Sequence, residues 1–210
     1  MNCCQGIEEL FSQQYVTKEL ARYLSKGPDK TTRMLTEAIE AEGVEGFSLL
    51  DIGGGLGAIQ HELLDSGIQK VTCVEASTAY LSAARAEVQR RGLAERVTFH
   101  HGNFVDLAKD IAPADVVTLD RVICCYPDME RLVGLSAARA RKLYGLVYPR
   151  DVWWTRMGIA LENFFYRLRR NPYRAFIHST TAVENVLRIN GFKHRSHRQT
   201  LAWQVAVYTR

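Results

Sequence analysis

Short apolar runs alternate with longer amphipathic stretches along most of the chain. The runs are five to seven residues long and rich in β-branched side chains, a pattern typical of buried strands. We predict strands at 47–52, 69–75, 96–100, 115–120 and 142–148, and helices at 57–66, 78–91 and 128–140. This alternation predicts a parallel sheet with helices on both faces.

The pattern changes near the carboxyl end. After a predicted helix at 180–190, which Gly191 closes, come the runs "FKHRSHRQ" and "LAWQVAVYT". Only about two residues separate these runs, which is too few for the crossover that two parallel strands need. They therefore predict a hairpin that adds an antiparallel edge, so the expected sheet has seven strands and is mostly parallel.

Two further helices are expected before the first strand, one over 7–25 and one that starts after "GPD" at 27–29. The second carries an apolar face and has Gly43 as its predicted C-cap. The residues of that face are Met34, Leu35, Ala38 and Ile39. We interpret both helices, within residues 1–45, as a cover on the edge of the sheet where a ligand would bind.

Composition places few limits on function. The chain has 210 residues, is 47% hydrophobic, and shows no repeat or linker, so we expect a single domain over 1–210. Its net charge of +4 suits an acidic small molecule as well as nucleic acid. No apolar stretch reaches the roughly 18 residues that span a bilayer, and the start "MNCCQGIEELF" lacks the features of a signal peptide. We therefore expect a cytoplasmic protein.

The five cysteines form two adjacent pairs, Cys3–Cys4 and Cys124–Cys125, and leave Cys73 alone. Neither pair has the spacing of a metal site with a partner histidine. We therefore predict reduced, mostly structural thiols and no metal site.

A glycine-rich turn, "LLDIGGGLGAIQHEL" at 49–63, follows the first predicted strand. A dinucleotide site requires G-x-G-x-x-G, whereas Gly53, Gly55 and Gly57 here follow Asp51 as D-x-G-x-G-x-G, with Gly54 inside the turn. A carboxylate at this place suits a ligand with an ammonium group and repels a pyrophosphate. The turn therefore predicts a ligand that is cationic near the loop.

The next two strand ends also carry polar groups. Glu75, followed by Ala76, ends the second strand, where its carboxylate can accept two hydrogen bonds from a ribose diol. Asn103 and Phe104 follow the third strand in "HHGNFVD", at a place suited to an adenine ring. Each feature alone is weak, and the prediction depends on the three strand ends together.

This set resembles the class I S-adenosylmethionine-dependent methyltransferases over essentially the whole chain. The resemblance implies a Rossmann-like, doubly wound α/β fold and S-adenosylmethionine (SAM) as cofactor. It also implies that Asp51 and the glycine loop hold the methionine end, Glu75 the ribose, and Asn103 with Phe104 the adenine. The implied cofactor set is Asp51, Gly53, Gly54, Gly55, Gly57, Glu75, Ala76, Asn103, Phe104 and Asp120. One departure is Asn103, where many relatives carry Asp.

The segment after the fourth strand, "LDRVICCYPD", bears on the methyl acceptor. The N/D-P-P-Y/F motif of enzymes that methylate amino groups of bases is absent there, and "RNPYR" at 170–174 lies after the fifth strand. A cytosine-C5 mechanism needs a nucleophilic Cys beside Pro, but Tyr126 separates the cysteines from Pro127. Metal-dependent catechol enzymes pair an Asp here with a later Asp-Asn, where this chain has "YPRDV".

A small-molecule acceptor remains. "KGPDKTTRML" and "DRVICCYPD" are similar to the magnesium-protoporphyrin O-methyltransferase branch, which implies a carboxylate acceptor on a large apolar acid. A carboxylate needs no base; for a hydroxyl acceptor His178 is our candidate base, although a capping or core-edge role fits it also. Tyr126 is a candidate for the acceptor pocket. The alternative hypothesis is an RNA methyltransferase or a SAM-binding module without turnover, which the missing motif and RNA-binding domain disfavour.

The segment "VWWTRMGIALENFFYRLRR" at 152–170 has more apolar surface than one packing face needs. We predict that residues 151–178 form a lid on the acceptor site and that Arg150, Arg156 and Arg174 bind an anionic group. Two alternatives are a buried core helix and a helix that lies on a membrane. The remaining parts are a cofactor-binding core at 46–150 and a helix with a hairpin at 179–210. The sequence does not set the oligomeric state.

Overall fold

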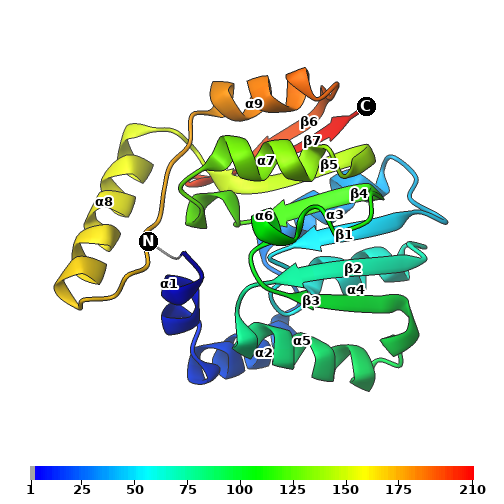
Figure 1. Ribbon diagram of the computed structural model, residues 1–210, viewed down its shortest axis with the longest axis horizontal. Coiled ribbons are helices and arrows are strands. Elements are labelled where there is room, and N and C mark those ends of the chain that lie inside the picture. Colours follow the sequence, from blue (N-terminus) through cyan, green and yellow to red (C-terminus); the bar gives the residue numbers. More distant parts are fainter. Residues whose placement is uncertain (1–2) are drawn as a thin grey trace.

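The computed structural model describes residues 3–210, with side chains from residue 6 onward, and Figure 1 shows a twisted sheet between two layers of helices. The strands are β1 Ser48–Ile52, β2 Lys70–Glu75, β3 Val97–His101, β4 Ala114–Asp120, β5 Ala140–Pro149, β6 Lys193–Gln199 and β7 Trp203–Thr209. Their order is β3-β2-β1-β4-β5-β7-β6; β1 to β5 are parallel and β7 is antiparallel to both neighbours. The predicted seven-stranded, mostly parallel α/β fold is confirmed.

The helices follow the predicted alternation. They are α1 Cys3–Leu10, α2 Gln13–Lys26, α3 Lys30–Glu40, α4 Ala58–Asp65, α5 Thr78–Arg90, α6 Phe104–Leu107, α7 Met129–Ala137, α8 Trp153–Leu168 and α9 Thr180–Ile189, with 3-10 turns η1 Ala94–Arg96 and η2 Ile123–Cys125. One apolar cluster joins the sheet to α7 and α9, and a second joins it to α3 and α4. The core therefore lies on both faces of the sheet, as a doubly wound fold requires.

Two local predictions differ from the structure, and three short elements were not predicted. The helix expected over 7–25 is two helices, because α1 ends at Leu10 and α2 begins at Gln13. Ser12 is the N-cap of α2, and its hydroxyl accepts a hydrogen bond from the Tyr15 N–H. The hairpin loop between β6 and β7 has three residues, 200–202, where about two were expected. Helix α6 and the 3-10 turns are too short to leave a periodic pattern in the sequence.

Helix α3 does not lie over the ligand edge as predicted. Leu35 and Ile39 are fully buried in the cluster between α3, α4 and the sheet. They pack so closely over β5 that a Cβ at Gly145 would come within 2.8 Å of Leu35 Cδ1 and 3.0 Å of Ile39 Cδ1. The apolar face of α3 is thus a core face, and only the start of this helix reaches the ligand edge.

Strand order reverses between β1 and β4. The chain runs from β1 into α4 in one helical layer and from β4 towards α7 in the other. Asp51 in β1 lies beside Cys73 of β2 and Thr118 of β4. Ligands of doubly wound sheets bind at this kind of switch point, outside the carboxyl ends of the strands. The register therefore brings the polar residues at the ends of β1, β2 and β4 to one place.

Candidate functional site

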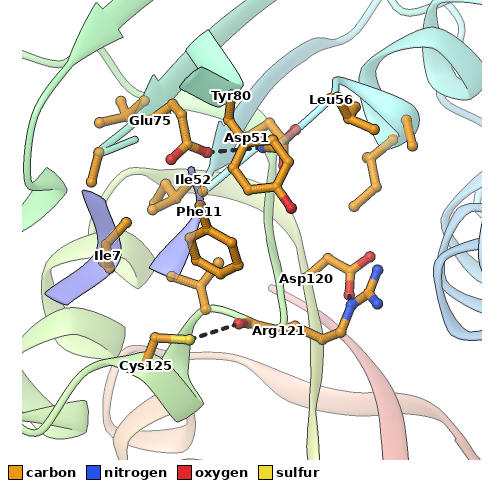
Figure 2. A pocket seen from close by; sticks show the side chains of 18 of the residues that line it. Ile7, Phe11, Asp51, Ile52, Leu56, Glu75, Tyr80, Asp120, Arg121 and Cys125 are labelled. Atoms are coloured by element: carbon orange, nitrogen blue, oxygen red, sulfur yellow. Dashed lines mark hydrogen bonds and ion pairs between the residues drawn. The ribbon is translucent and has the colours of Figure 1, made fainter. Parts of the chain in front are cut away.

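A cavity of about 320 Å³ lies at this carboxyl edge (Figure 2). Its walls come from the β1–α4 loop, the ends of β2 and β4, the turn before α6, and helices α1 and α2. In Figure 2, Asp51 and Glu75 lie on one side and Asp120, Arg121 and Cys125 on the other. This volume and position are typical of a small-molecule site.

The glycine loop makes a turn that other residues adopt only with strain. Gly53, Gly55 and Gly57 have φ of +66°, +53° and +82°, in the left-handed region. A Cβ at Gly55 would meet nothing closer than the Tyr80 ring at 3.9 Å, so this position is open towards the cavity. A Cβ at Gly54 would come within 2.7 Å of Asp51 Oδ2, on the core side. The loop thus presents backbone to the cavity and packs tightly behind it.

Asp51 is the most deeply buried carboxylate of the cavity wall. Its Oδ1 accepts a hydrogen bond from Thr118 Oγ1 at 2.7 Å and its Oδ2 accepts one from Gln60 Nε2 at 2.9 Å. Burial disfavours the charged form and raises the pKa of Asp51 to about 7. Both donors are neutral, so an ammonium group of a bound ligand would supply the charge that this carboxylate otherwise lacks.

Glu75 is buried at the end of β2 and faces the same part of the cavity. Its two oxygens accept hydrogen bonds from the Gly55 N–H at 2.9 Å and the Ser77 N–H at 2.8 Å. Burial raises the pKa of Glu75, and these backbone donors oppose the rise. The bonds fix the carboxylate against the glycine loop, and Ala76 also lines the cavity. Glu75 and Asp51 together give this region an acidic character that fits a cationic ligand.

Asn103 and Phe104 line the cavity at the turn before α6. Asn103 is the N-cap of α6: its Oδ1 accepts a hydrogen bond from the Val105 N–H at 3.2 Å, and its Nδ2 donates to Asp106 Oδ2 at 3.0 Å. The Nδ2 also lies 3.5 Å from Tyr126 Oη. Phe104 is buried beneath this turn. The two residues predicted to bind adenine therefore form a pre-ordered wall.

The opposite wall contains a network of ion pairs. Arg121, directly after β4, donates from Nη1 to Asp29 Oδ2 at 2.8 Å and from Nε to Asp120 Oδ1 at 3.1 Å. Asp29 also pairs with Arg22 at 2.7 Å, and Thr32 Oγ1 donates to Asp120 Oδ2 at 2.6 Å. Arg121 has a φ of +60°, a strained value that these partners hold in place. The network connects the start of α3 to the end of β4.

Aromatic side chains from helices α2 and α5 and from two connecting segments close the cavity. The ring of Phe11, between α1 and α2, lies 5.6 Å from Tyr15, 5.1 Å from Tyr80 and 6.5 Å from Tyr173, measured between centroids. All four residues line the cavity, and we call them the aromatic wall. Tyr80 Oη donates to Glu19 of α2, which ties this cover to α5. Helices α1 and α2 therefore cover the site.

Two predicted site residues lie outside the cavity wall. Gly57 is the N-cap of α4, and its φ of +82° explains the glycine without ligand contact. His178 Nε2 lies 2.9 Å from the Ile123 carbonyl oxygen and 3.0 Å from that of Tyr126. Because carbonyls only accept, this nitrogen carries a proton and holds the η2 turn. His178 thus holds the η2 turn outside the cavity wall, and its role as a general base stays a prediction that this conformation does not support.

The predicted lid, residues 151–178, contributes fewer residues to the cavity wall than expected. No residue of α8 lines the cavity, nor do Arg150, Arg156 and Arg174. The arginines bind Thr200, Asp151 and Asn171 respectively, among other groups. Within 151–178 only Tyr173 reaches the cavity, so closure by α8 stays a prediction that this conformation does not support. The alternative of a buried core helix is excluded, because most apolar side chains of α8 are exposed.

Cys124 and Cys125, expected as buried structural thiols, line the cavity after β4. The Cys124 thiol donates to the Arg121 carbonyl oxygen at 3.2 Å, and Cys125 Sγ lies 3.0 Å from Tyr173 Oη. These contacts attach the η2 turn to the aromatic wall. Cys73 is buried beside the glycine loop.

Sequence reasoning missed several residues of the site. Arg121 directly follows Asp120 at the end of β4, and this position at a strand end could have indicated Arg121 as a site residue. The aromatic wall left no such signal, since Phe11 and Tyr173 come from distant parts of the chain. Tyr126, predicted for the acceptor pocket, does line the cavity, as does Asp120.

Comparisons with known proteins agree with this geometry. Residues 49–142 match the family described as a methyltransferase domain. A ribosomal protein L11 methyltransferase from Desulforamulus reducens is 26% identical over 110 residues, which make up 51% of this chain and 35% of that protein. The matched part thus spans about a third of that relative's length.

Two solved structures share the fold. Magnesium protoporphyrin IX methyltransferase from Synechocystis PCC 6803 with bound SAM has a TM-score of 0.71, at 15% identity, over 100% of this chain and 98% of that one. An O-methyltransferase family protein from Burkholderia thailandensis has a TM-score of 0.65, at 19% identity, over 95% and 63% respectively. Residues 49–142 thus match a methyltransferase domain, and the whole chain shares the fold of a methyltransferase solved with bound SAM.

Proposed function

We propose that this protein binds SAM against Asp51, Gly55 and Glu75 and transfers the methyl group to a small acceptor held beneath the aromatic wall. The observation that carries the proposal is one cavity with two unlike parts. The part next to the glycine loop is acidic and suits a cationic cofactor, and the other part is aromatic and contains Arg121. A methyl donor and an acceptor need to meet in such a shared, closed space.

The acceptor we favour is flat or aromatic and carries an anionic group, and we favour O-methylation. The rings of the aromatic wall line the cavity, and stacking on such rings suits a planar molecule. Arg121 carries a guanidinium that can bind a carboxylate through two hydrogen bonds, in exchange for its present pairs with Asp29 and Asp120. Both structural neighbours carry methyltransferase names, one of them an O-methyltransferase family name, which is consistent with this choice.

SAM supplies an activated methyl group when it is bound. The protein's own residues then have to orient the acceptor and exclude water. Phe11 and Tyr15 cover the cavity for the second task, while Arg121 and the η2 turn define where the acceptor lies. A carboxylate acceptor needs no base, which fits a cavity wall that His178 does not join.

The test is incubation of the protein with metabolite fractions and methyl-deuterated SAM, followed by mass spectrometry for products that gain the label. Arg121→Gln should raise the apparent Michaelis constant for the acceptor about tenfold or more and leave cofactor affinity within about twofold. Arg150→Gln, away from the cavity, is the matched control. Label found only in added tRNA, or cofactor binding with no labelled product, would favour the RNA-methylating or non-catalytic alternative.

A further inference from the structure

Helix α8 presents its apolar face to solvent. Figure 1 shows it at the edge of the molecule, apart from the sheet, on the side of the carboxyl ends of the strands. Trp153 is 69% exposed and Leu168 is 70% exposed, although they lie at the two ends of the helix. The exposed apolar side chains are Trp153, Trp154, Met157, Leu161, Phe164, Phe165 and Leu168, which we call the α8 face. At 3.6 residues per turn they share one side of the helix.

The opposite side of α8, which carries Thr155, Ile159, Asn163 and Tyr166, packs against the protein. Thr155 is the buried residue of this helix. Asn163 exchanges two hydrogen bonds with the backbone of Ala175, from Nδ2 to the carbonyl at 2.8 Å and from the N–H to Oδ1 at 2.9 Å. An ordinary surface helix has the opposite orientation, with its apolar side against the core. Because specific hydrogen bonds hold α8 this way round, its exposed apolar side is a built feature of the fold.

The charge of the chain is concentrated next to this face. Residues 150–174 contain six arginines and two carboxylates, a net charge of +4, which equals the net charge of the whole chain. One of the arginines, Arg156, pairs with Asp151 at 2.6 Å. Arg167, Arg169 and Arg170 are exposed near the end of the helix. Bulky apolar groups therefore lie beside a cationic border.

We propose that α8 docks the protein on an anionic lipid surface, with the α8 face in the headgroup and acyl boundary and the arginines against lipid phosphates. Tryptophan, leucine and phenylalanine on one side with arginine at the border is the composition of helices that lie in a membrane interface. A helix of 16 residues is about 24 Å long, too short and too charged to cross a bilayer. In residues 3–210 no helix meets the length and hydropathy needed to span one.

A second copy of the chain is a less suitable partner for the α8 face than an anionic lipid surface. Two α8 faces packed against each other would bring together two segments of net charge +4, and like charges disfavour that contact. An anionic bilayer instead supplies both the apolar volume and the opposite charge. Charge complementarity thus selects the lipid surface.

The experiment is co-flotation of the full chain with vesicles of phosphatidylcholine containing about one third phosphatidylglycerol, compared with pure phosphatidylcholine. We expect binding to the anionic vesicles, weakened by added salt, and a blue shift of tryptophan emission as Trp153 leaves water. Trp153→Ser combined with Phe164→Ser should weaken binding at least tenfold. Arg167→Gln and Arg169→Gln should each weaken it about fivefold.

Matched controls lie on α9, where Ile189→Ser and Arg188→Gln remove equally exposed groups and should leave binding unchanged. All four substituted residues, three on α8 and Arg169 directly after it, are exposed, so circular dichroism should show that these variants fold. Absence of binding to anionic vesicles at low salt would overturn the proposal, as would binding that the α8 variants do not weaken. Dimers in sedimentation, abolished by the Trp153 and Phe164 changes, with no lipid binding, would assign the face to protein association instead.

Discussion

At the scale of single residues, Asp51 links the packing of the sheet to the wall of the cavity. It bonds to Thr118 of the neighbouring strand and to Gln60 of α4, so it holds the turn between β1 and α4 in shape. The same burial that makes this role possible raises its pKa to about 7. A cationic ligand group near the loop would favour the ionised form and lower that pKa again.

Cofactor affinity should therefore depend on pH. Below about pH 7, Asp51 has to lose its proton when it meets the ligand's ammonium group. Binding of S-adenosylhomocysteine should therefore strengthen from about pH 5.5 to about pH 8. At the acidic end the affinity should approach a tenfold change per pH unit. Isothermal titration calorimetry in buffers of different ionisation enthalpy measures the released proton. In Asp51→Asn the binding should be weaker and this pH dependence absent; an unchanged profile would mean that the ammonium lies elsewhere.

Neighbouring glycines should respond differently to substitution. Gly55→Val places a branched side chain in the open part of the cavity and should abolish cofactor binding, with a loss of about 1–2 kcal/mol in stability because of its positive φ. Gly54→Ala places a Cβ within 2.7 Å of Asp51 Oδ2 and 2.8 Å of Cys73 Sγ and should lower stability by about 1–3 kcal/mol. Urea unfolding measures the loss of stability and calorimetry the loss of cofactor binding, so together they distinguish the two variants. Normal binding in Gly55→Val would show that the loop does not face the ligand.

At the scale of elements, the cover of the site is attached by side chains from distant parts of the chain. Tyr80 of α5 donates to Glu19 of α2, and Asp29, the N-cap of α3, pairs with Arg121 after β4. A cofactor of the expected size has to pass this cover, so these contacts restrain the entrance. We expect the ligand to enter by movement of α1 and α2, because the sheet itself is fixed by its core on both faces.

Tyr80→Phe removes the contact with Glu19 and retains the ring of the aromatic wall. We expect faster hydrogen exchange in α1 and α2, faster cofactor association and dissociation, and little change in the exchange of β1 and β4. Hydrogen exchange with mass spectrometry and stopped-flow binding measure these effects. Tyr208→Phe, in the buried core, is a control that leaves the cover intact. Unaltered exchange in α2 would show that this bond does not hold the cover.

The sequence predicted elements and strand ends better than the wall that closes the site. Asp51, Glu75 and Asn103 were predictable because parallel strands end at one edge, so position along the chain gives position in space. His178 and Gly57 do not line the cavity, and the sequence did not show this, since the direction of a residue in a turn leaves no periodic signal. The Asp29–Arg121 pair spans 92 residues, and no local pattern predicts such a contact. For α8 the apolar stripe was evident, but its outward direction was not.

At the scale of the whole molecule, two buried groups make stability depend on pH in opposite directions. His61 is fully buried, and its Nδ1 lies 3.0 Å from Tyr23 Oη. Burial lowers the pKa of His61 to about 4, below the value of about 6.5 in an unfolded chain. Between these values the unfolded chain binds a proton that the folded protein does not. Asp51 has its folded pKa raised, so it retains a proton on folding over much of the same range.

His61 should therefore destabilise the fold as pH falls from about 6.5 towards about 4, by about 3 kcal/mol in total. Asp51 makes an opposite contribution of similar size over this range, so the two nearly cancel in the wild type. The free energy of unfolding in urea, measured for the wild type and for His61→Asn across this range, isolates the histidine because other groups cancel in the difference. The wild type should lose stability relative to the variant as pH falls. A difference that does not change with pH would mean that His61 can be protonated in the folded state.

The central claim is that the cavity at the carboxyl edge binds a SAM-type cofactor. Isothermal titration of S-adenosylhomocysteine into the folded full chain at about pH 7.5 tests it most directly, with Gly55→Val as the negative control. The account predicts one binding site per chain in the wild type and none in the folded variant. A wild-type protein that is folded yet gives no binding, or binding that Gly55→Val leaves unchanged, would contradict it.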